Sequence, residues 1–154
     1  MSEIEKKLIE MNIDIPIGSH VSGTYVSARW SGNYIYVSGN GPKIDGKIAC
    51  AGKIGNDLTI EEGYYAARLS MINIIGVLKN ELGDLDKIEK FVKLVGFIAS
   101  ADDFYEQTKV LNGASDLLVE VFGDKGIHAR SAVGVNVLPF NQPVVIETVV
   151  EIKV

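Results

Sequence analysis

The chain has 154 residues, of which 47% are hydrophobic and 23% are charged, so it can fold around one core. Its net charge of -5 and its scattered Lys and Arg residues argue against nucleic acid as a partner, and residues 64–78, the longest apolar stretch, are too few and too polar to cross a membrane. The lone Cys50 excludes an intramolecular disulfide, and no secretory signal is recognisable. We expect one cytoplasmic domain over residues 1–154, with residues 1–20 as a peripheral N-terminal extension.

The N-terminal third of the sequence predicts a short helix followed by strands. Apolar residues at helical spacing indicate an amphipathic helix over residues 2–11, with Ser2 as its N-cap. Residues 25–29 and 33–38 are rich in strand-forming residues and are separated by a Ser-Gly-Asn turn. A third short strand near residues 47–51 would extend this hairpin into a small antiparallel meander.

Two long helices and a buried strand come next. A Thr-x-x-Glu capping box at Thr59 opens a helix whose apolar stripe ends at Gly83. Residues 90–99 are apolar on both faces, which is typical of a central strand covered by protein on each side. An Asp-x-x-Glu sequence at Asp103 repeats the capping pattern and predicts a second helix that ends before Gly123.

Two strands, residues 130–137 and 144–154, close the chain. The order of elements is that of an α+β domain, in which both long helices cover one face of the sheet. Side chains alternate across a strand, so the first of these strands has two different sides. One side carries Val133, Val135 and Val137, and the other carries Arg130, Ala132, Gly134 and Asn136. An apolar side without a helix to cover it suggests an oligomer, although the sequence does not say which side this is.

The most informative constellation lies near the C-terminus. It comprises Gly-Ile-His-Ala-Arg-Ser-Ala-Val-Gly at residues 126–134, Leu-Pro at residues 138–139 and Pro-Val-Val-Ile-Glu at residues 143–147, together with Tyr25 and the Ser-Gly pair at residues 38–39. At these residues the chain resembles the Rid family, also called YjgF-like or endoribonuclease L-PSP. The resemblance extends from about Tyr25 to the C-terminus.

The resemblance implies a fold, an assembly and an activity. The fold is the chorismate-mutase-like α+β fold, with a mixed sheet and two long helices packed on one face. The assembly is a homotrimer with clefts between adjacent subunits. The activity is the hydrolytic deamination of reactive small 2-imino acids and enamines to 2-keto acids and ammonia, without a cofactor.

The same resemblance assigns roles to individual residues. Arg130 matches the family arginine that holds the substrate carboxylate, and its planar fork suits a bidentate contact; the alternative is a structural salt bridge. Glu147 matches the carboxylate that positions or activates the attacking water, and the alternative is a structural carboxylate. Four further matches line the cleft of the family: Tyr25, Ser38, Gly39 and Asn112.

Three features depart from the family pattern. Ala132 stands where many imine deaminases have Cys, the loop over residues 139–146 is about two residues longer than usual, and His128 precedes Ala129 where Pro is frequent. They indicate a divergent subgroup. His128 is either a second acid-base residue or a packing residue. Because His128 lies far in sequence from His20 and Cys50 belongs to no Cys-x-x-Cys pair, no metal site is predicted.

Two hypotheses of different class follow for function. The first is an imine or enamine deaminase acting on a small substrate that carries a carboxylate. The second is a non-catalytic trimer that binds small carboxylate metabolites in the Arg130 cleft and has a regulatory role. A ribonuclease is a third possibility, against which the acidic net charge argues.

Overall fold

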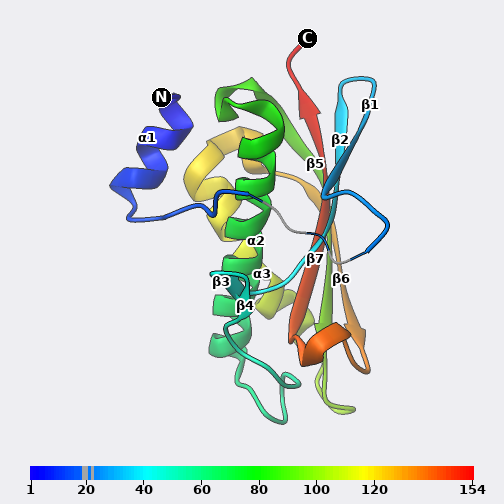
Figure 1. Ribbon diagram of the computed structural model, residues 1–154. Coiled ribbons are helices and arrows are strands. Elements are labelled where there is room, and N and C mark those ends of the chain that lie inside the picture. Colours follow the sequence, from blue (N-terminus) through cyan, green and yellow to red (C-terminus); the bar gives the residue numbers. More distant parts are fainter. Residues whose placement is uncertain (19–20, 22) are drawn as a thin grey trace.

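A five-stranded mixed sheet forms one layer of the protein and two long helices form the other, as the computed structural model shows (Figure 1). The structure describes residues 1–18, 21 and 23–154, so His20 lies outside the described residues. The predicted α+β class, with both long helices on one face, is confirmed.

The sheet has the strand order β1-β2-β7-β5-β6. These strands are β1 (Ala28–Ser31), β2 (Tyr34–Asn40), β5 (Ile88–Ala99), β6 (Ala129–Val135) and β7 (Val144–Ile152). β5 and β6 are parallel, and the other neighbours are antiparallel. β5 therefore lies inside the sheet, as predicted for a central strand. Only one of its faces is covered in the single chain, because the helices pack on one side.

The first long helix, α2 (Ile60–Leu82), has the caps that the sequence predicts. The hydroxyl of Thr59 accepts the backbone N–H of Glu62 at 3.2 Å, and Gly83 ends the helix in the left-handed region with φ 71°. A residue with a Cβ is strained in that conformation, whereas Gly adopts it freely.

The second long helix, α3 (Gln107–Phe122), begins later than predicted. Its N-cap is Glu106, and no side chain caps it, so the capping box at Asp103 is wrong. The preceding segment is held as a turn instead, because Phe104 packs against the core and its backbone N–H donates to the carbonyl of Ala101 at 3.0 Å. Burial of an aromatic ring has prevailed over the local capping pattern.

The small hairpin after β2 also differs from the prediction. β3 (Lys43–Ile44) and β4 (Lys47–Ile48) form a separate two-stranded sheet rather than an extension of the main one. Asp45 and Gly46 both have positive φ, as a tight hairpin turn requires. The amide of Asn73 donates to the carbonyls of Gly41 and Lys43 and thereby ties the hairpin to α2.

The N-terminal helix, α1 (Glu3–Glu10), is fastened at its start. The hydroxyl of Ser2 accepts the backbone N–H of Glu5 at 3.1 Å, so the predicted cap is confirmed. The carboxylate of Asp86 accepts the first two N–H groups of the helix at 2.8 and 3.0 Å. Leu8 reaches the core. The remaining connections contain the single-turn helices η1 (Leu85–Lys87), η2 (Gly123–Gly126) and η3 (Pro139–Asn141).

The hydrophobic core lies between the helix layer and the inner face of the sheet. The two long helices approach each other closely at Gly113, where an added Cβ would overlap the backbone carbonyl of Tyr64. The buried residues of this core include Ile35, Val37, Met71, Ile74, Leu78, Leu94, Ile98, Val110, Leu117, Ile146 and Val150.

Gly113→Ala should destabilise the protein by forcing α2 and α3 apart. Alanine normally favours a helix over glycine by about 1 kcal/mol, but overpacking a close contact costs about 1–3 kcal/mol or more. We expect urea denaturation at fixed protein concentration to show a lower free energy of unfolding. Asn80→Ala, on the exposed side of α2, is the control. A Gly113→Ala protein as stable as the wild type would contradict the close helix contact.

Candidate functional site

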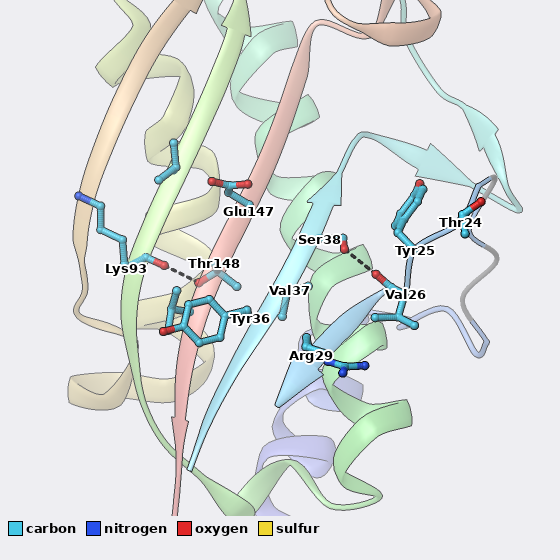
Figure 2. Close-up of a pocket in the computed structure, with 12 residues that line it drawn as sticks. Thr24, Tyr25, Val26, Arg29, Tyr36, Val37, Ser38, Lys93, Glu147 and Thr148 are labelled. Atoms are coloured by element: carbon cyan, nitrogen blue, oxygen red, sulfur yellow. Dashed lines mark hydrogen bonds between the residues drawn. The ribbon is translucent and has the colours of Figure 1, made fainter. Parts of the chain in front are cut away.

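The open face of the sheet carries a hollow of about 670 Å³ (Figure 2). Its walls come from the segment before β1 and from strands β1, β2, β5 and β7. The polar residues that line it are Thr24, Tyr25, Arg29, Tyr36, Ser38, Lys93, Glu147 and Thr148. The hollow therefore combines both signs of charge with two phenol rings.

The loop that carries Tyr25 is pinned to β2. The hydroxyl of Ser38 donates to the carbonyl of Val26 at 2.6 Å, and the backbone N–H of Ser38 donates to the carbonyl of Ser27 at 2.9 Å. These bonds hold the Tyr25 ring at the rim of the hollow, where it is 54% exposed. The structure thus brings Tyr25 and Ser38 together.

Glu147 lies on the same open face, on β7. It is paired in register with Val95 of β5, which in turn is paired with Ser131 of β6. The ammonium of Lys93, another residue of the hollow, lies 3.4 Å from the hydroxyl of Ser131. Glu147 is exposed and forms no side-chain hydrogen bond with the part of the chain that the structure describes. Its carboxylate is available to a ligand or to a neighbouring molecule.

Arg130 lies on the opposite, helix-facing side of the sheet. It shares its row with Leu94 and Thr148, both of which are buried; Thr148 also borders the hollow. Its guanidinium donates from Nη1 to the hydroxyl of Ser115 at 3.0 Å and from Nη2 to the carbonyl of Thr108 at 3.3 Å. Both acceptors belong to α3, so this helix orients the guanidinium at the edge strand β6.

The predicted site residues therefore form two groups within one chain. Tyr25, Ser38 and Glu147 meet in the hollow, whereas Arg130 stands behind the sheet at its β6 edge. Cross-strand register explains the separation, because Arg130 and Glu147 occupy adjacent rows and successive rows face opposite sides.

The other predicted positions divide in the same way. Asn112 lies on α3 one turn after Thr108 and one turn before Ser115, on the face that contacts Arg130. Ala132 shares the Arg130 side of β6 and packs against the core. Gly39, near the end of β2, does not line the hollow; a Cβ there would lie 2.8 Å from Val145.

His128 joins the Arg130 group. Its Nε2 lies 2.9 Å from the hydroxyl of Ser115, and its Nδ1 lies 2.7 Å from the carbonyl of Gly126. Burial lowers the pKa of His128; the bond to the Gly126 carbonyl opposes this effect, and the charge of Arg130 adds to it.

Sequence reasoning missed six polar residues of these groups: Ser115, Thr24, Arg29, Tyr36, Lys93 and Thr148. Two of them were within reach of simple periodicity. Tyr36 precedes Ser38 by two positions, which places both on one strand face, and Ser115 follows Asn112 by three, which places both on one helix face. The pairing of Ser115 with His128 depends on the crossover between α3 and β6 and has no local sequence signal.

Neither a metal-binding cluster nor a membrane-spanning helix is found in the part of the chain that the structure describes. Among the residues that the structure describes, no three His, Cys, Asp or Glu side chains gather closely enough to hold a metal ion. None of the described helices is long and apolar enough to span a bilayer. Cys50 is half-buried, and burial raises the pKa of its thiol, which keeps it protonated at neutral pH.

Comparison with known proteins identifies the family to which this fold belongs. A family model described as "YjgF/chorismate_mutase-like, putative endoribonuclease" matches residues 5–152. The chain belongs to this family, so the resemblance at the C-terminal motif and the chorismate-mutase-like fold are both confirmed.

Individual relatives agree with this assignment over almost the whole chain. Protein TCP17 of Trypanosoma cruzi is 40% identical over 151 residues, which cover 97% of this chain and 94% of that protein. The crystal structure of Atu1372 from Agrobacterium tumefaciens is 44% identical with a TM-score of 0.91, covering 97% of this chain and 92% of that one. A putative endoribonuclease from Shewanella oneidensis is 33% identical with a TM-score of 0.94, covering 97% and 99% of the two chains.

Protonation of His128 should destabilise the fold. Because its pKa is lowered in the folded protein, the unfolded chain takes up the proton first as the pH falls, and stability declines below the unfolded pKa of about 6.5. We expect the free energy of unfolding, measured with urea from about pH 7 to about pH 5, to fall more steeply for the wild type than for His128→Gln. Parallel curves for the two proteins would show that His128 is not held neutral by its surroundings.

Proposed function

We propose that the protein hydrolyses small reactive 2-imino acids to 2-keto acids and ammonia, with Arg130 as the anchor for the substrate carboxylate. The observation that carries the proposal is the fixed orientation of the Arg130 guanidinium. Arg130 is half-buried and held by two acceptors on α3, which leaves further N–H donors of its planar fork for a carboxylate. The half-buried setting would strengthen such a charge-assisted contact relative to bulk water.

The two groups of site residues can form one cleft if subunits contribute different parts. Arg130 lies on the edge strand β6, and a neighbouring subunit can approach the outer edge of this strand. We infer a homotrimer in which the open face of one subunit meets the β6 edge of the next. The open face exposes the large side chain of Tyr36 at 51% and Val133 at 40%, which favours its burial in an assembly.

In this arrangement each predicted residue has a task, and no cofactor is needed. Glu147 of the adjacent subunit would position the attacking water. The ring of Tyr25 would form one wall of the substrate pocket, and its hydroxyl would donate a hydrogen bond to the substrate. Ser38 would line the pocket beside Tyr25, whereas Gly39, which does not line the hollow of the single chain, would border the cleft only in the assembly. Asn112 forms no side-chain hydrogen bond to another described residue, so its amide is available beside Arg130 for a polar group of the substrate.

A non-catalytic binding protein is the second candidate function. The observation in its favour is that Ala132 supplies no reactive group on the Arg130 side of the strand, while Glu147 is on the other face. Such a trimer would hold a 2-keto acid or a similar metabolite through Arg130 in a regulatory role. The endoribonuclease name of the family is less compatible with a chain whose net charge is -5.

The assembly can be tested by sedimentation equilibrium. We expect a trimer for the wild type and dissociation for Val133→Glu, because a buried carboxylate without a partner opposes association. Val119→Glu is the matched control, since Val119 is similarly exposed, at 46%, but lies on α3. A monomeric wild type at micromolar concentration would exclude a cleft shared between subunits.

Catalysis should depend on Arg130 more than on other residues. Arg130→Ala leaves the carboxylate of the substrate unpaired, which should cost about 2–5 kcal/mol of transition-state stabilisation, or about 30-fold to several thousand-fold in kcat/KM. Arg130→Lys should recover only part of this loss, because Lys lacks the planar fork. The assay generates 2-iminobutanoate with an amino-acid dehydratase and measures the surviving imine by semicarbazide trapping.

Arg68→Ala is the control for this series, because Arg68 pairs with Glu120 on the outer surface of the helices. Ala132→Cys should change the rate little if a thiol is dispensable. If the wild type leaves the decay of every imino acid at the buffer rate, the enzyme hypothesis is wrong and the binding function is the better account.

A further inference from the structure

We propose that Ser115 and His128 form a proton-transfer pair that acts on the water attacking a ligand held by Arg130. The inference rests on the proposed hydrolysis and supplies it with a base from the same chain as the anchoring arginine. Nucleophile or water activation by a paired histidine requires a hydrogen bond between the two groups and a third group that orients the ring. Ser115, His128 and the carbonyl of Gly126 meet both requirements.

The hydrogen positions in this chain of bonds follow from the partners. The carbonyl of Gly126 can only accept, so Nδ1 of His128 carries the ring hydrogen. In the neutral ring Nε2 is then an acceptor, and the hydroxyl of Ser115 must donate to it. The guanidinium of Arg130 can only donate, so it occupies one lone pair of the Ser115 oxygen. The second lone pair of that oxygen remains for an external donor such as water.

The setting of Ser115 is unusual for a helix interior. A serine in a helix often bonds to the carbonyl four residues earlier, as Ser70 of α2 does with Ala66 at 2.7 Å. The hydroxyl hydrogen of Ser115 instead points to a ring that lies 13 positions along the chain, outside its own helix. The bond therefore reflects the meeting of α3 with the start of β6.

Burial and one neighbouring charge keep His128 neutral at physiological pH. Burial lowers its pKa most, and the charge of Arg130, two residues further along the chain, lowers it as well. On the elements packed nearby, Lys125 of η2 donates to the carbonyl of Ile88, and Asp116 of α3 accepts from the hydroxyl of Tyr64. Asp124 also lies on η2, and neither it nor Asp116 contributes to the shift at His128.

The proposed step balances as a simple hydrolysis. Water donates a proton to the oxygen of Ser115 while Ser115 passes its own proton to Nε2 of His128, and the hydroxide forms a C–O bond at the imine carbon. The electrons of the C=N π bond move to nitrogen. His128 then returns its proton through Ser115 to the nitrogen, which gives a neutral carbinolamine. The pair next takes the hydroxyl proton of the carbinolamine and delivers it to the same nitrogen, so the C–N bond breaks, ammonia leaves and the carbonyl forms. Nδ1 keeps its bond to Gly126 throughout.

The pair, rather than Glu147, is therefore the expected base, and the pH profile distinguishes them. Wild-type kcat/KM should fall as the pH drops through the lowered pKa of His128, because protonation removes the acceptor. His128→Gln and Ser115→Ala should lose about 10²–10⁴-fold in kcat. His128→Gln should also lose the acidic limb of the pH profile, which is the fall of kcat/KM at low pH. Glu147→Gln should retain the limb.

Further measurements separate catalysis from structural support. Binding of 2-ketobutanoate, which tests the carboxylate anchor, should be little changed in His128→Gln. Imidazole should restore activity to His128→Gly, and Ser115→Thr should retain more activity than Ser115→Ala. Should His128→Gln fail to fold, the activity of Ser115→Ala and the imidazole rescue still test the pair, and a fully active Ser115→Ala protein would overturn it.

The outcomes keep the two proposals apart. An inactive wild type overturns the proposed function and the role of the pair within it. An active wild type whose acidic limb persists in His128→Gln, with kcat reduced less than tenfold, overturns the pair alone and leaves the deaminase function standing.

Discussion

The burial of one sheet face beneath α2 and α3 is the constraint on which the other features of this protein depend. The two helices are long enough for one face, and their close contact at Gly113 brings them together over β5 and β7. Every second residue of those strands is thereby committed to the core. The alternate residues, among them Glu147 and Tyr36, are left to form the hollow.

The same constraint determines the chemistry of Arg130. Its row faces the helices, but β6 is an edge strand, so the guanidinium reaches the border of the core and not its centre. There α3 supplies acceptors that orient it without neutralising its charge. A buried carboxylate partner would have neutralised that charge, whereas a hydroxyl and a carbonyl are uncharged and leave the guanidinium able to bind an anion.

The placement of Ser115 and His128 shows how a parallel crossover can assemble a polar cluster. α3 leads into η2 and then into β6, so His128, just before the strand begins, comes to rest beside the helix that precedes it. Arg130, two residues further, lies on the same side. A single connection thus brings a hydroxyl, an imidazole and a guanidinium together. The hydrogen bonds of the Ser115 hydroxyl to His128 and Arg130 restrict the motion of all three side chains.

The amino-acid sequence by itself determined the elements with strong local signals: the α2 caps at Thr59 and Gly83, the apolar stripes of both long helices, the hairpin of β1 and β2, and the family. The first strand of that hairpin begins at Ala28 and not at Tyr25, so its predicted bounds are wrong. The sequence did not determine the start of α3, where burial of Phe104 outweighed a capping pattern, or the separate β3–β4 hairpin, which Asn73 ties to α2. Only the tertiary structure decided that Arg130 and Glu147 stand on opposite faces and that His128 meets Ser115. Strand register and the crossover of α3 fix those relations, and neither is encoded in local spacing.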